Sequence, residues 1–143
     1  SVVFPVTCSV PQGSVLGPLE FIAYTDDVIE IFERYGLRHH LFAGHDKQAY
    51  TSTDLNSIDD VRRNLHDCTT DVSNWCSSRR LQLNQSKTEL AWFGKRSRLD
   101  KLHQQDCTVT VGSTVIQPSA VVRDLGVLLD SELSMKKHVA KVT

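Results

Sequence analysis

Two short stretches of the chain carry residue types that could do chemistry at a defined place. Residues 11–18, Pro-Gln-Gly-Ser-Val-Leu-Gly-Pro, predict a loop whose two glycines let a flat ligand approach the backbone. The same pattern also marks ordinary strand-to-helix turns. The second stretch, Gly44-His45-Asp46, predicts a short turn between two strands with one carboxylate at its tip. A carboxylate in that position can bind a hard cation such as Mg²⁺.

Other groups of metal-ligand residue types are less favourable. Asp26 and Asp27 are adjacent on a predicted helix, where consecutive side chains point about 100° apart, so a solvated face is favoured over a shared ion. His39 and His40, taken with the turn residues just named, would suit a softer metal such as zinc. These two histidines point to opposite faces of a strand, which argues against that site.

The cysteine pattern favours free, buried thiols. The four cysteines are Cys8, Cys68, Cys76 and Cys107. They form no CxxC pair, so a zinc site or a disulfide framework is not expected.

Length and composition indicate an ordinary globular protein. The 143 residues fit one domain or a piece of a larger one, and 40% are hydrophobic and 23% charged. No run approaches the roughly 20 apolar residues that span a bilayer, and the first residues do not resemble a secretory signal. We therefore expect an intracellular protein, in the nucleus or the cytoplasm.

The net charge of −1 hides an asymmetry along the chain. Residues 1–75 contain 11 acidic and 5 basic side chains, whereas residues 76–143 contain 6 acidic and 11 basic ones. A polyanion would bind the second half, although a solvated surface with no partner explains the same surplus.

The first half of the chain predicts a strand, a helix and a hairpin. Residues 1–10 resemble an irregular or edge strand because prolines interrupt it. Apolar residues recur at helical spacing over 19–35, and Gly36 is placed to end that helix. Residues 37–43 and 47–53 predict the two strands of the hairpin.

The helix that begins after Ser57 is the clearest element of the pattern. Ser57 can cap it, and Asp59 and Asp60 favour its positive end. Its apolar stripe consists of Ile58, Val61, Leu65, Cys68, Val72, Trp75 and Cys76.

The second half predicts mostly strands. In order, the runs are a turn at 84–86, a strand at 88–93, a basic loop at 95–98, a hairpin from 108–111 and 114–117, a strand-like run at 121–129 with a bulge at Gly126, and the start of a helix at 131–142. Together with the first half, this order predicts an α+β fold built on an antiparallel sheet.

Five blocks of the sequence resemble, in the correct order, the palm segment of reverse transcriptases from non-LTR retrotransposons. They are Val-Pro-Gln-Gly-Ser-Val-Leu-Gly-Pro-Leu at 10–19, Tyr-Thr-Asp-Asp-Val at 24–28, Leu-Phe-Ala at 41–43, Leu-Asn-Gln-Ser-Lys-Thr-Glu at 83–89 and Asp-Leu-Gly-Val-Leu-Leu-Asp at 124–130. The resemblance implies the antiparallel-sheet palm subdomain of a right-hand polymerase. It would cover residues 1–143, with 1–94 holding the loop, the hairpin, the helix and the following strand, and 95–143 holding the second hairpin and a primer-holding strand.

The resemblance also implies a chemistry and its partners. Such polymerases bind an RNA template, a DNA primer and a deoxynucleoside triphosphate, and Mg²⁺ ions held by aspartates activate the primer hydroxyl and stabilise the leaving pyrophosphate. Where the family has an Asp-Asp pair, this chain has Gly44-His45-Asp46. Asp46 is the remaining candidate for catalysis and metal binding, because imidazole is a poor Mg²⁺ ligand and His45 does not replace a carboxylate.

The family also has an aspartate on a strand upstream of the Pro-Gln-Gly loop. Because ten residues precede that loop here, we expect the fingers region and the first catalytic strand to be absent. Mg²⁺ is then not expected to bind productively, and the chain is expected to be an inactive fragment of an RNA-directed DNA polymerase, a nucleotidyltransferase.

Other family roles carry over to single positions. Gln12 and Gly13 match the loop that lies against the template base and the incoming nucleotide. Lys87 matches a lysine proposed to protonate the leaving pyrophosphate, or is a surface lysine after a turn. Gly126 matches a glycine where the backbone approaches the primer, or marks a bulge in a buried strand.

Lys95, Arg96 and Arg98 could contact nucleic-acid phosphates, with Trp92 and Phe93 beside them. Strand geometry sends one of these two aromatic residues into the core. The alternative to a polymerase fragment is thus a non-catalytic nucleic-acid-binding module that uses the basic second half. Because a palm sheet lacking its neighbouring strand exposes an edge, we also expect self-association through that edge.

Overall fold

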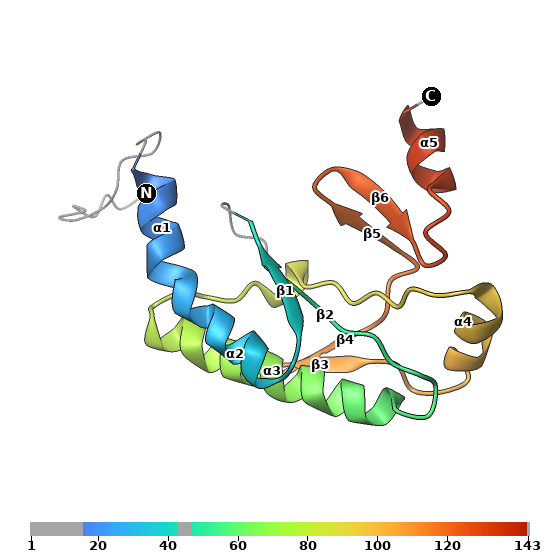
Figure 1. Ribbon diagram of the computed structural model, residues 1–143, viewed down its shortest axis with the longest axis horizontal. Coiled ribbons are helices and arrows are strands. Elements are labelled where there is room, and N and C mark those ends of the chain that lie inside the picture. Colours follow the sequence, from blue (N-terminus) through green and yellow to red (C-terminus); the bar gives the residue numbers. More distant parts are fainter. Residues whose placement is uncertain (1–15, 43–46, 143) are drawn as a thin grey trace, which may run out of the picture. The chain divides into compact units, whose positions relative to one another are not determined.

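The computed structural model describes residues 16–42 and 47–142 of the 143-residue chain (Figure 1). The chain divides into two compact units, Ser1–Thr51 and Ser52–Thr143, called here the N-terminal and C-terminal units. The strand predicted at residues 1–10 lies outside the described residues.

The N-terminal unit begins with a helical segment that is interrupted once. The prediction of a helix over 19–35 is confirmed in outline, as α1 (Gly17–Thr25), a 3-10 turn η1 (Asp26–Val28) and α2 (Ile29–Arg34). The break follows Thr25, whose hydroxyl donates back to the Phe21 carbonyl at 2.9 Å. Such back-bonding competes with the regular helix ladder and often bends the helix.

Gly36 ends this segment as predicted. Its φ is +64°, its N–H donates to the Glu33 carbonyl, and the next N–H, of Leu37, donates to the Phe32 carbonyl, both at 2.9 Å. These two bonds form a Schellman motif, which needs a left-handed residue at the glycine position.

The hairpin predicted next is confirmed, with shorter strands than expected. β1 (Arg38–Leu41) pairs antiparallel with β2 (Lys47–Tyr50), in a register that sets Arg38 opposite Tyr50. One face of the hairpin packs on α2, because the His39 ring stacks on the Phe32 ring with centroids 5.7 Å apart. The buried hydrophobic residues of this unit are Val28, Ile31, Phe32 and Leu37.

The C-terminal unit is built on α3 (Ile58–Ser78), the helix predicted from its apolar stripe. Four stripe residues are buried, namely Ile58, Cys68, Val72 and Cys76. Burial, with a smaller contribution from Asp71, raises the pKa of the Cys68 thiol to about 11. The predicted free thiols are confirmed for Cys68, Cys76 and Cys107.

The cap predicted at Ser57 is wrong in its chemistry. The Ser57 side chain makes no capping hydrogen bond. The Asp54 carboxylate instead accepts the N–H groups of Asn56 and Ser57, at 2.9 and 3.1 Å. This Asx turn fixes the backbone that leads into α3 without a capping bond from the serine.

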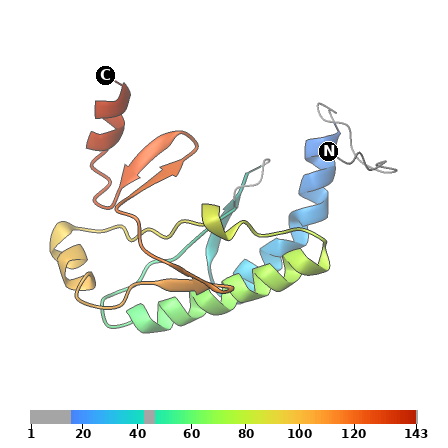
Figure 2. The same ribbon diagram turned by 180° about the vertical axis from the view of Figure 1, so that it is seen from behind.

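The hairpin predicted around Gly112-Ser113 is confirmed as β3 (Val109–Val111) and β4 (Thr114–Ile116). It lies along α3 in both ribbon views (Figure 1, Figure 2). Val109, Val111 and Ile116 form one buried cluster with Leu65, Leu83 and Leu90 packed against it.

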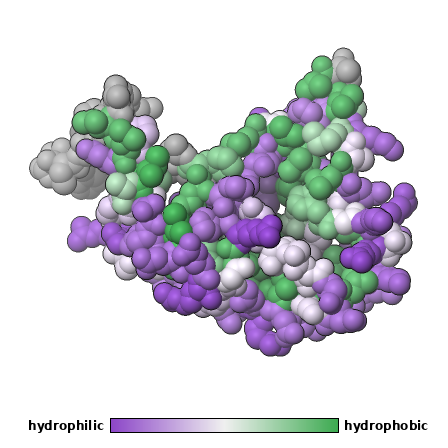
Figure 3. All heavy atoms as spheres, in the orientation of Figure 1, coloured by the Kyte–Doolittle hydropathy of each residue, from purple (hydrophilic) through white to green (hydrophobic). Residues whose placement is uncertain are grey.

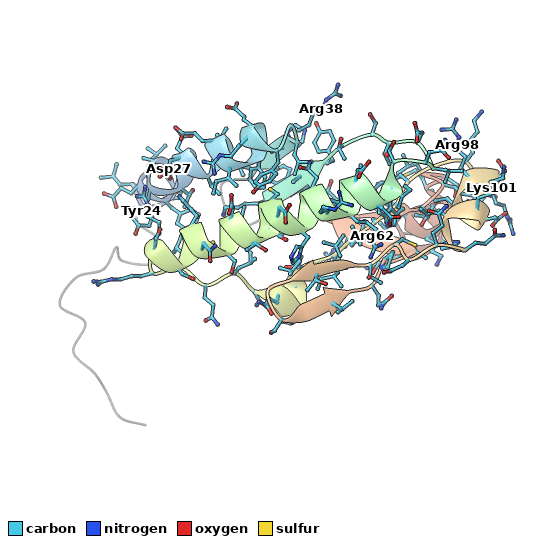
Figure 4. All side chains as sticks on the ribbon, turned by 90° about the horizontal axis from the view of Figure 1, so that it is seen from below. Tyr24, Asp27, Arg38, Arg62, Arg98 and Lys101 are labelled. Carbon is cyan, nitrogen blue, oxygen red and sulfur yellow. The ribbon has the colours of Figure 1, made fainter. Side chains whose placement is uncertain are left out.

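Two side chains of α3 hold the free edge of β3. Arg62 Nε donates to the Thr108 carbonyl at 2.7 Å, and His66 Nδ1 donates to the Thr110 carbonyl at 2.8 Å. His66 Nδ1 is the donor in this contact, because a carbonyl only accepts. Figure 4 shows Arg62 between α3 and the strand.

The strand predicted at 88–93 is wrong, and so is the basic loop at 95–98. Leu90 makes a single isolated parallel bridge with Pro118, and pairing stops there because proline has no N–H for a ladder. Residues Arg96–Leu102 form α4, which buries Leu99 and Leu102 against Ile58 and Cys107. The spacing of these two leucines satisfies a helix better than a loop.

The run at 121–129 is a hairpin rather than one strand with a bulge. β5 (Val121–Asp124) pairs antiparallel with β6 (Val127–Asp130). Leu125 and Gly126 form the turn with φ values of +44° and +91°. Two left-handed residues between paired strands are the pattern of a type I′ turn, so Gly126 is a turn residue.

The last helix, α5 (Lys136–Val142), begins later than the predicted start at 131. The Asp130 carboxylate accepts the N–H groups of Glu132 and Ser134, and Leu133 and Met135 have left-handed backbones, which delays the helix. Within the described residues the strands form three separate two-stranded antiparallel sheets. The α+β class is thus confirmed, with small sheets in place of one large sheet.

Candidate functional site

Several predicted site residues lie outside the described residues. These are Gln12, Gly13, Gly44, His45 and Asp46. Their predicted roles in nucleotide, template and metal binding stay predictions.

Lys87 ends a short 3-10 turn, η2 (Gln85–Lys87), and its side chain is exposed. The turn is held by Asn84, whose side-chain oxygen accepts the N–H and the hydroxyl of Ser86 at 3.1 and 2.7 Å. It docks on the β3–β4 hairpin through Gln85, which accepts the Thr114 hydroxyl at 2.8 Å. The backbone around Lys87 is therefore well positioned, while its amine is left to solvent.

An open groove lies where the segment before α4 meets the segment after β6. Its volume is about 430 Å³, and it is lined by Phe93, Gly94, Lys95, Arg96, Glu132 and Leu133. We call it the Phe93 groove. One backbone hydrogen bond joins the two segments, because the Gly94 N–H donates to the Ser131 carbonyl at 3.0 Å. The Ser131 N–H in turn donates to the Ala120 carbonyl at 3.1 Å, just before β5.

The two adjacent aromatic residues before the groove point in different directions, as predicted. Trp92 Nε1 donates to the Cys107 carbonyl at 3.1 Å, and its ring packs on the buried cluster beneath α4. Phe93 is 46% exposed and lines the groove. Leu133, on the opposite wall, is 53% exposed, so the groove offers an apolar surface between cations.

Two of the predicted cationic residues, Lys95 and Arg96, line this groove. Arg98 lies further along α4, with Lys101, and all four cations are exposed. Figure 4 shows Arg98 and Lys101 pointing away from the ribbon at the same helix. No carboxylate in the described part of the chain forms an ion pair with Lys95, Arg96 or Arg98.

The side chains that sequence reasoning missed are Lys101, Glu132 and Leu133. Lys101 follows Arg98 by three residues, so a helical reading of 96–102 would have placed both on one side. Nothing in the sequence pattern links Glu132 or Leu133 to the groove, because the Gly94–Ser131 hydrogen bond that joins them spans 37 positions.

Gly126 lies apart from the groove within the same unit. The β5–β6 register puts Asp130 at the base of the hairpin and the Asp124–Val127 pair next to the turn. Four residues of strand, roughly 13 Å, therefore separate Gly126 from the segment that lines the groove. A Cβ built on Gly126 would meet nothing within 4 Å, so the turn is open to the approach of another molecule.

Hydrophobic side chains are also exposed around these elements. Figure 3 shows them on α5 and the β5–β6 hairpin beside hydrophilic neighbours. The most exposed are Leu125, Leu133, Val139 and Val142. Exposed apolar and cationic side chains together are typical of surfaces that contact nucleic acid or another protein.

The described residues do not assemble a metal site. Among residues 16–42 and 47–142, no three His, Cys, Asp or Glu side chains gather closely enough to hold an ion. Asp26 is exposed whereas Asp27 is partly buried, which agrees with two different directions for the adjacent carboxylates. None of the helices in the described part of the chain is long and apolar enough to cross a membrane.

The structure is thus a small α+β fold in which exposed cationic and aromatic side chains lie around one groove. Comparison with known proteins gives a more particular relation. The chain is 26% identical over 136 residues to a probable RNA-directed DNA polymerase from transposon BS of Drosophila melanogaster. The match covers 94% of this chain and 15% of that relative.

This similarity confirms the resemblance to a transposon-encoded reverse transcriptase, at a distance. The chain spans about 15% of the length of the curated relative it matches. No protein-family model matches the chain, and no solved structure matches it significantly.

Proposed function

We propose that this chain is a palm segment of a retrotransposon reverse transcriptase that contributes nucleic-acid contacts and does not catalyse nucleotidyl transfer by itself. The observation that supports this best is a set of exposed cations with no described carboxylate paired to them, namely Lys95 and Arg96 in the Phe93 groove and Arg98 on α4. Cations with no acidic partner among the described residues can neutralise a phosphate backbone and so release its counterions. The partners would be the RNA template and the DNA primer.

The proposed palm spans residues 1–143, with segments 1–94 and 95–143 as the sequence suggests. Gln12 and Gly13 would lie against the template base and the nucleotide, Lys87 would face the pyrophosphate, and Gly126 would face the primer backbone. The open space over Gly126 and the exposure of Lys87 are compatible with these roles.

The proposed lack of catalysis depends on the carboxylates. Two Mg²⁺ ions in a polymerase site are held by several aspartates, because hard cations need oxygen ligands and negative charge. The Asp-Asp position carries Gly44-His45-Asp46, and the described residues add no cluster of acids. A donor set with one such carboxylate does not fit a pair of dications.

Salt-dependent binding tests the nucleic-acid contact. Neutralising Lys95, Arg96 and Arg98 to Gln together should weaken binding to an RNA–DNA primer–template duplex. The slope of log affinity against log salt should fall by about 2.7 if all three contact phosphates. The matched control neutralises Lys136, Lys137 and Lys141 of α5, which are equally exposed. An equal fall in the control, or no binding by the unaltered chain at about 50 mM salt, would refute the proposed interface.

A primer-extension assay tests the catalytic half of the proposal. With Mg²⁺ or Mn²⁺, a homopolymer template and labelled nucleotide, the chain should give no product above background. Extension that disappears in Asp46→Ala would overturn it, because the residual carboxylate would then be sufficient.

The alternative, a stand-alone binding module, predicts equal affinity for a single strand and for the primer–template duplex, whereas a palm segment should prefer the duplex.

A further inference from the structure

One face of the β1–β2 hairpin is both aromatic and exposed. Because side chains alternate along paired strands, Arg38 and His40 of β1 share a face with Gln48 and Tyr50 of β2. The opposite face carries His39, which packs on Phe32 of α2. Arg38, His40 and Tyr50 are exposed, so this second face is turned to solvent.

The rings on this face make one connected surface. The His40 and Tyr50 rings stack with centroids 5.6 Å apart and planes 27° apart, and the Tyr50 hydroxyl lies 3.3 Å from His40 Nε2. The Phe42 ring continues the row, with its centroid 6.4 Å from that of His40. Tyr50 keeps 43% of its surface exposed, so this residue remains accessible to another flat group.

The charge of the N-terminal unit is divided between its elements. The described carboxylates lie on the helical segment, at Glu20, Asp26, Asp27, Glu30 and Glu33. The described hairpin residues carry Arg38 and Lys47 and no carboxylate. Figure 4 shows Arg38 extending away from the ribbon, on the face that holds Tyr50. The charge next to the rings therefore suits an anionic partner.

We propose that this face, the Tyr50 platform, binds an unpaired base of a single-stranded nucleic acid, which stacks on the Tyr50–His40 pair while Arg38 contacts an adjacent phosphate. The chemistry is general, because every base has a flat π-face and stacking on an aromatic side chain tolerates any sequence. An uncharged apolar partner would not need a cation beside the rings. This inference rests on the proposed nucleic-acid function but concerns a separate surface, on the other unit of the chain.

Oligonucleotides with and without bases test the platform on the full chain. One probe is a fluorescent twelve-nucleotide thymidine strand, and the other is a strand of the same length made of abasic sugar phosphates. Tyr50→Leu removes the aromatic ring but keeps an apolar side chain. It should weaken binding to the thymidine strand by roughly 5- to 100-fold and leave abasic binding within twofold. Tyr50→Phe keeps the ring and should bind both probes as the unaltered chain does.

Tyr24→Leu is the matched control, because Tyr24 is also exposed, at 45%, but belongs to α1 and not to the Tyr50 platform. It should change neither affinity. A thermal melt of each variant shows whether the fold is kept, and if Tyr50→Leu fails to melt cooperatively, His40→Thr tests the same pair with a strand-forming residue. A second readout is the quenching of 2-aminopurine placed in the thymidine strand, which should occur with the unaltered chain and be lost in Tyr50→Leu.

The outcomes separate this inference from the proposed function. If the unaltered chain binds both probes equally, or if Tyr50→Leu lowers both affinities alike, the platform is refuted while phosphate binding stands. If only the neutralisation of Lys95, Arg96 and Arg98 matters for both probes, binding takes place at the Phe93 groove alone. If neither probe binds, both proposals fail.

Discussion

The packing of Gln85 against Gly112 predicts a measurable cost for a single methyl group. Gly112 lies at the turn of the β3–β4 hairpin with a φ of +59°. A Cβ at this position would lie 2.3 Å from Gln85 Nε2 and 3.3 Å from Gln85 Cδ. Gly112→Ala therefore forces the Gln85 side chain away and strains the turn. Because Gln85 is the first residue of the turn that ends at Lys87, the change also disturbs a predicted site residue.

The expected loss of stability in Gly112→Ala is the sum of two contributions. A non-glycine residue held in the left-handed region costs about 1–2 kcal/mol. Displacing Gln85 loses its hydrogen bond from Thr114, which at this exposed position contributes about 0.5–1 kcal/mol. Gly112→Ala should thus lower the free energy of unfolding by about 1.5–3 kcal/mol. In a Gln85→Ala background the displacement is absent, and the cost should fall to the backbone strain alone.

Urea unfolding followed by tryptophan fluorescence measures this effect where it occurs, because both tryptophans, Trp75 and Trp92, belong to the C-terminal unit. Gly126→Ala is the matched control. It also has a left-handed φ, but its added Cβ would meet nothing within 4 Å, so it should cost the backbone strain only. The packing argument is wrong if Gly112→Ala costs no more than Gly126→Ala, or if Gln85→Ala leaves its cost unchanged.

Two further predictions concern charged groups of the same unit. Arg62→Leu should lower the free energy of unfolding by about 1–2 kcal/mol, because the half-buried Thr108 carbonyl loses its donor. The control is Arg63→Leu, which should cost less than about 0.5 kcal/mol because the Arg63 side chain is 70% exposed. Equal costs of the two variants in urea unfolding would contradict the role of Arg62. Hydrogen bonds lower the pKa of Asp130 from the ordinary 3.8, chiefly the bond from the Ser134 N–H and, to a smaller extent, those from the Ser134 hydroxyl and the Glu132 N–H. The ionised Asp130 therefore stabilises the fold above about pH 4, and this contribution is lost as the pH falls through the lowered pKa. Asp130→Asn should therefore flatten the acid limb of the stability curve, and an unchanged limb in circular dichroism would refute this.

The elements with strong periodicity could be predicted from the sequence. The stripe from Ile58 to Cys76 predicts α3, because it places seven apolar residues on one helical face, four of which are buried. Gly112-Ser113 lies between two runs in which apolar and polar residues alternate, and this pattern predicts the β3–β4 hairpin. Gly36 could be assigned as a helix end because a left-handed position favours glycine.

The wrong predictions have two physical causes, which are local backbone geometry that the residue type does not signal and tertiary contacts that override the local pattern. Leu125 occupies a left-handed turn position that asparagine or glycine usually fills, so the β5–β6 hairpin gives no turn signal at that residue. Residues 88–93 have strand-like composition, yet Pro118 limits their pairing to one bridge. Lys95-Arg96-Ser97-Arg98 resembles a loop until Leu99 and Leu102 find a buried cluster that holds α4.

The predicted self-association through a sheet edge stays a prediction, and the structure narrows where it could occur. Arg62 and His66 occupy the outer edge of β3 by donating to the carbonyls of Thr108 and Thr110. An edge whose acceptors are already bonded does not template another strand. Pairing between copies at this hairpin would have to use β4, where Val115 is 54% exposed.

The Phe93 groove depends on a few hydrogen bonds rather than on a hydrophobic core. The Ser131 carbonyl accepts the Gly94 N–H, and the Ser131 N–H donates to the Ala120 carbonyl. The Asp130 carboxylate accepts the Ser134 N–H and so positions the backbone after β6. Phe93 and Leu133, which line the groove, remain about half exposed, so little apolar burial supports its shape. Regions with few buried apolar contacts open at a lower free energy than the core around α3. A phosphate backbone bound across Lys95 and Arg96 would then stabilise the groove locally. Acidification that protonates Asp130 should weaken this binding at a higher pH than the pH at which α3 unfolds.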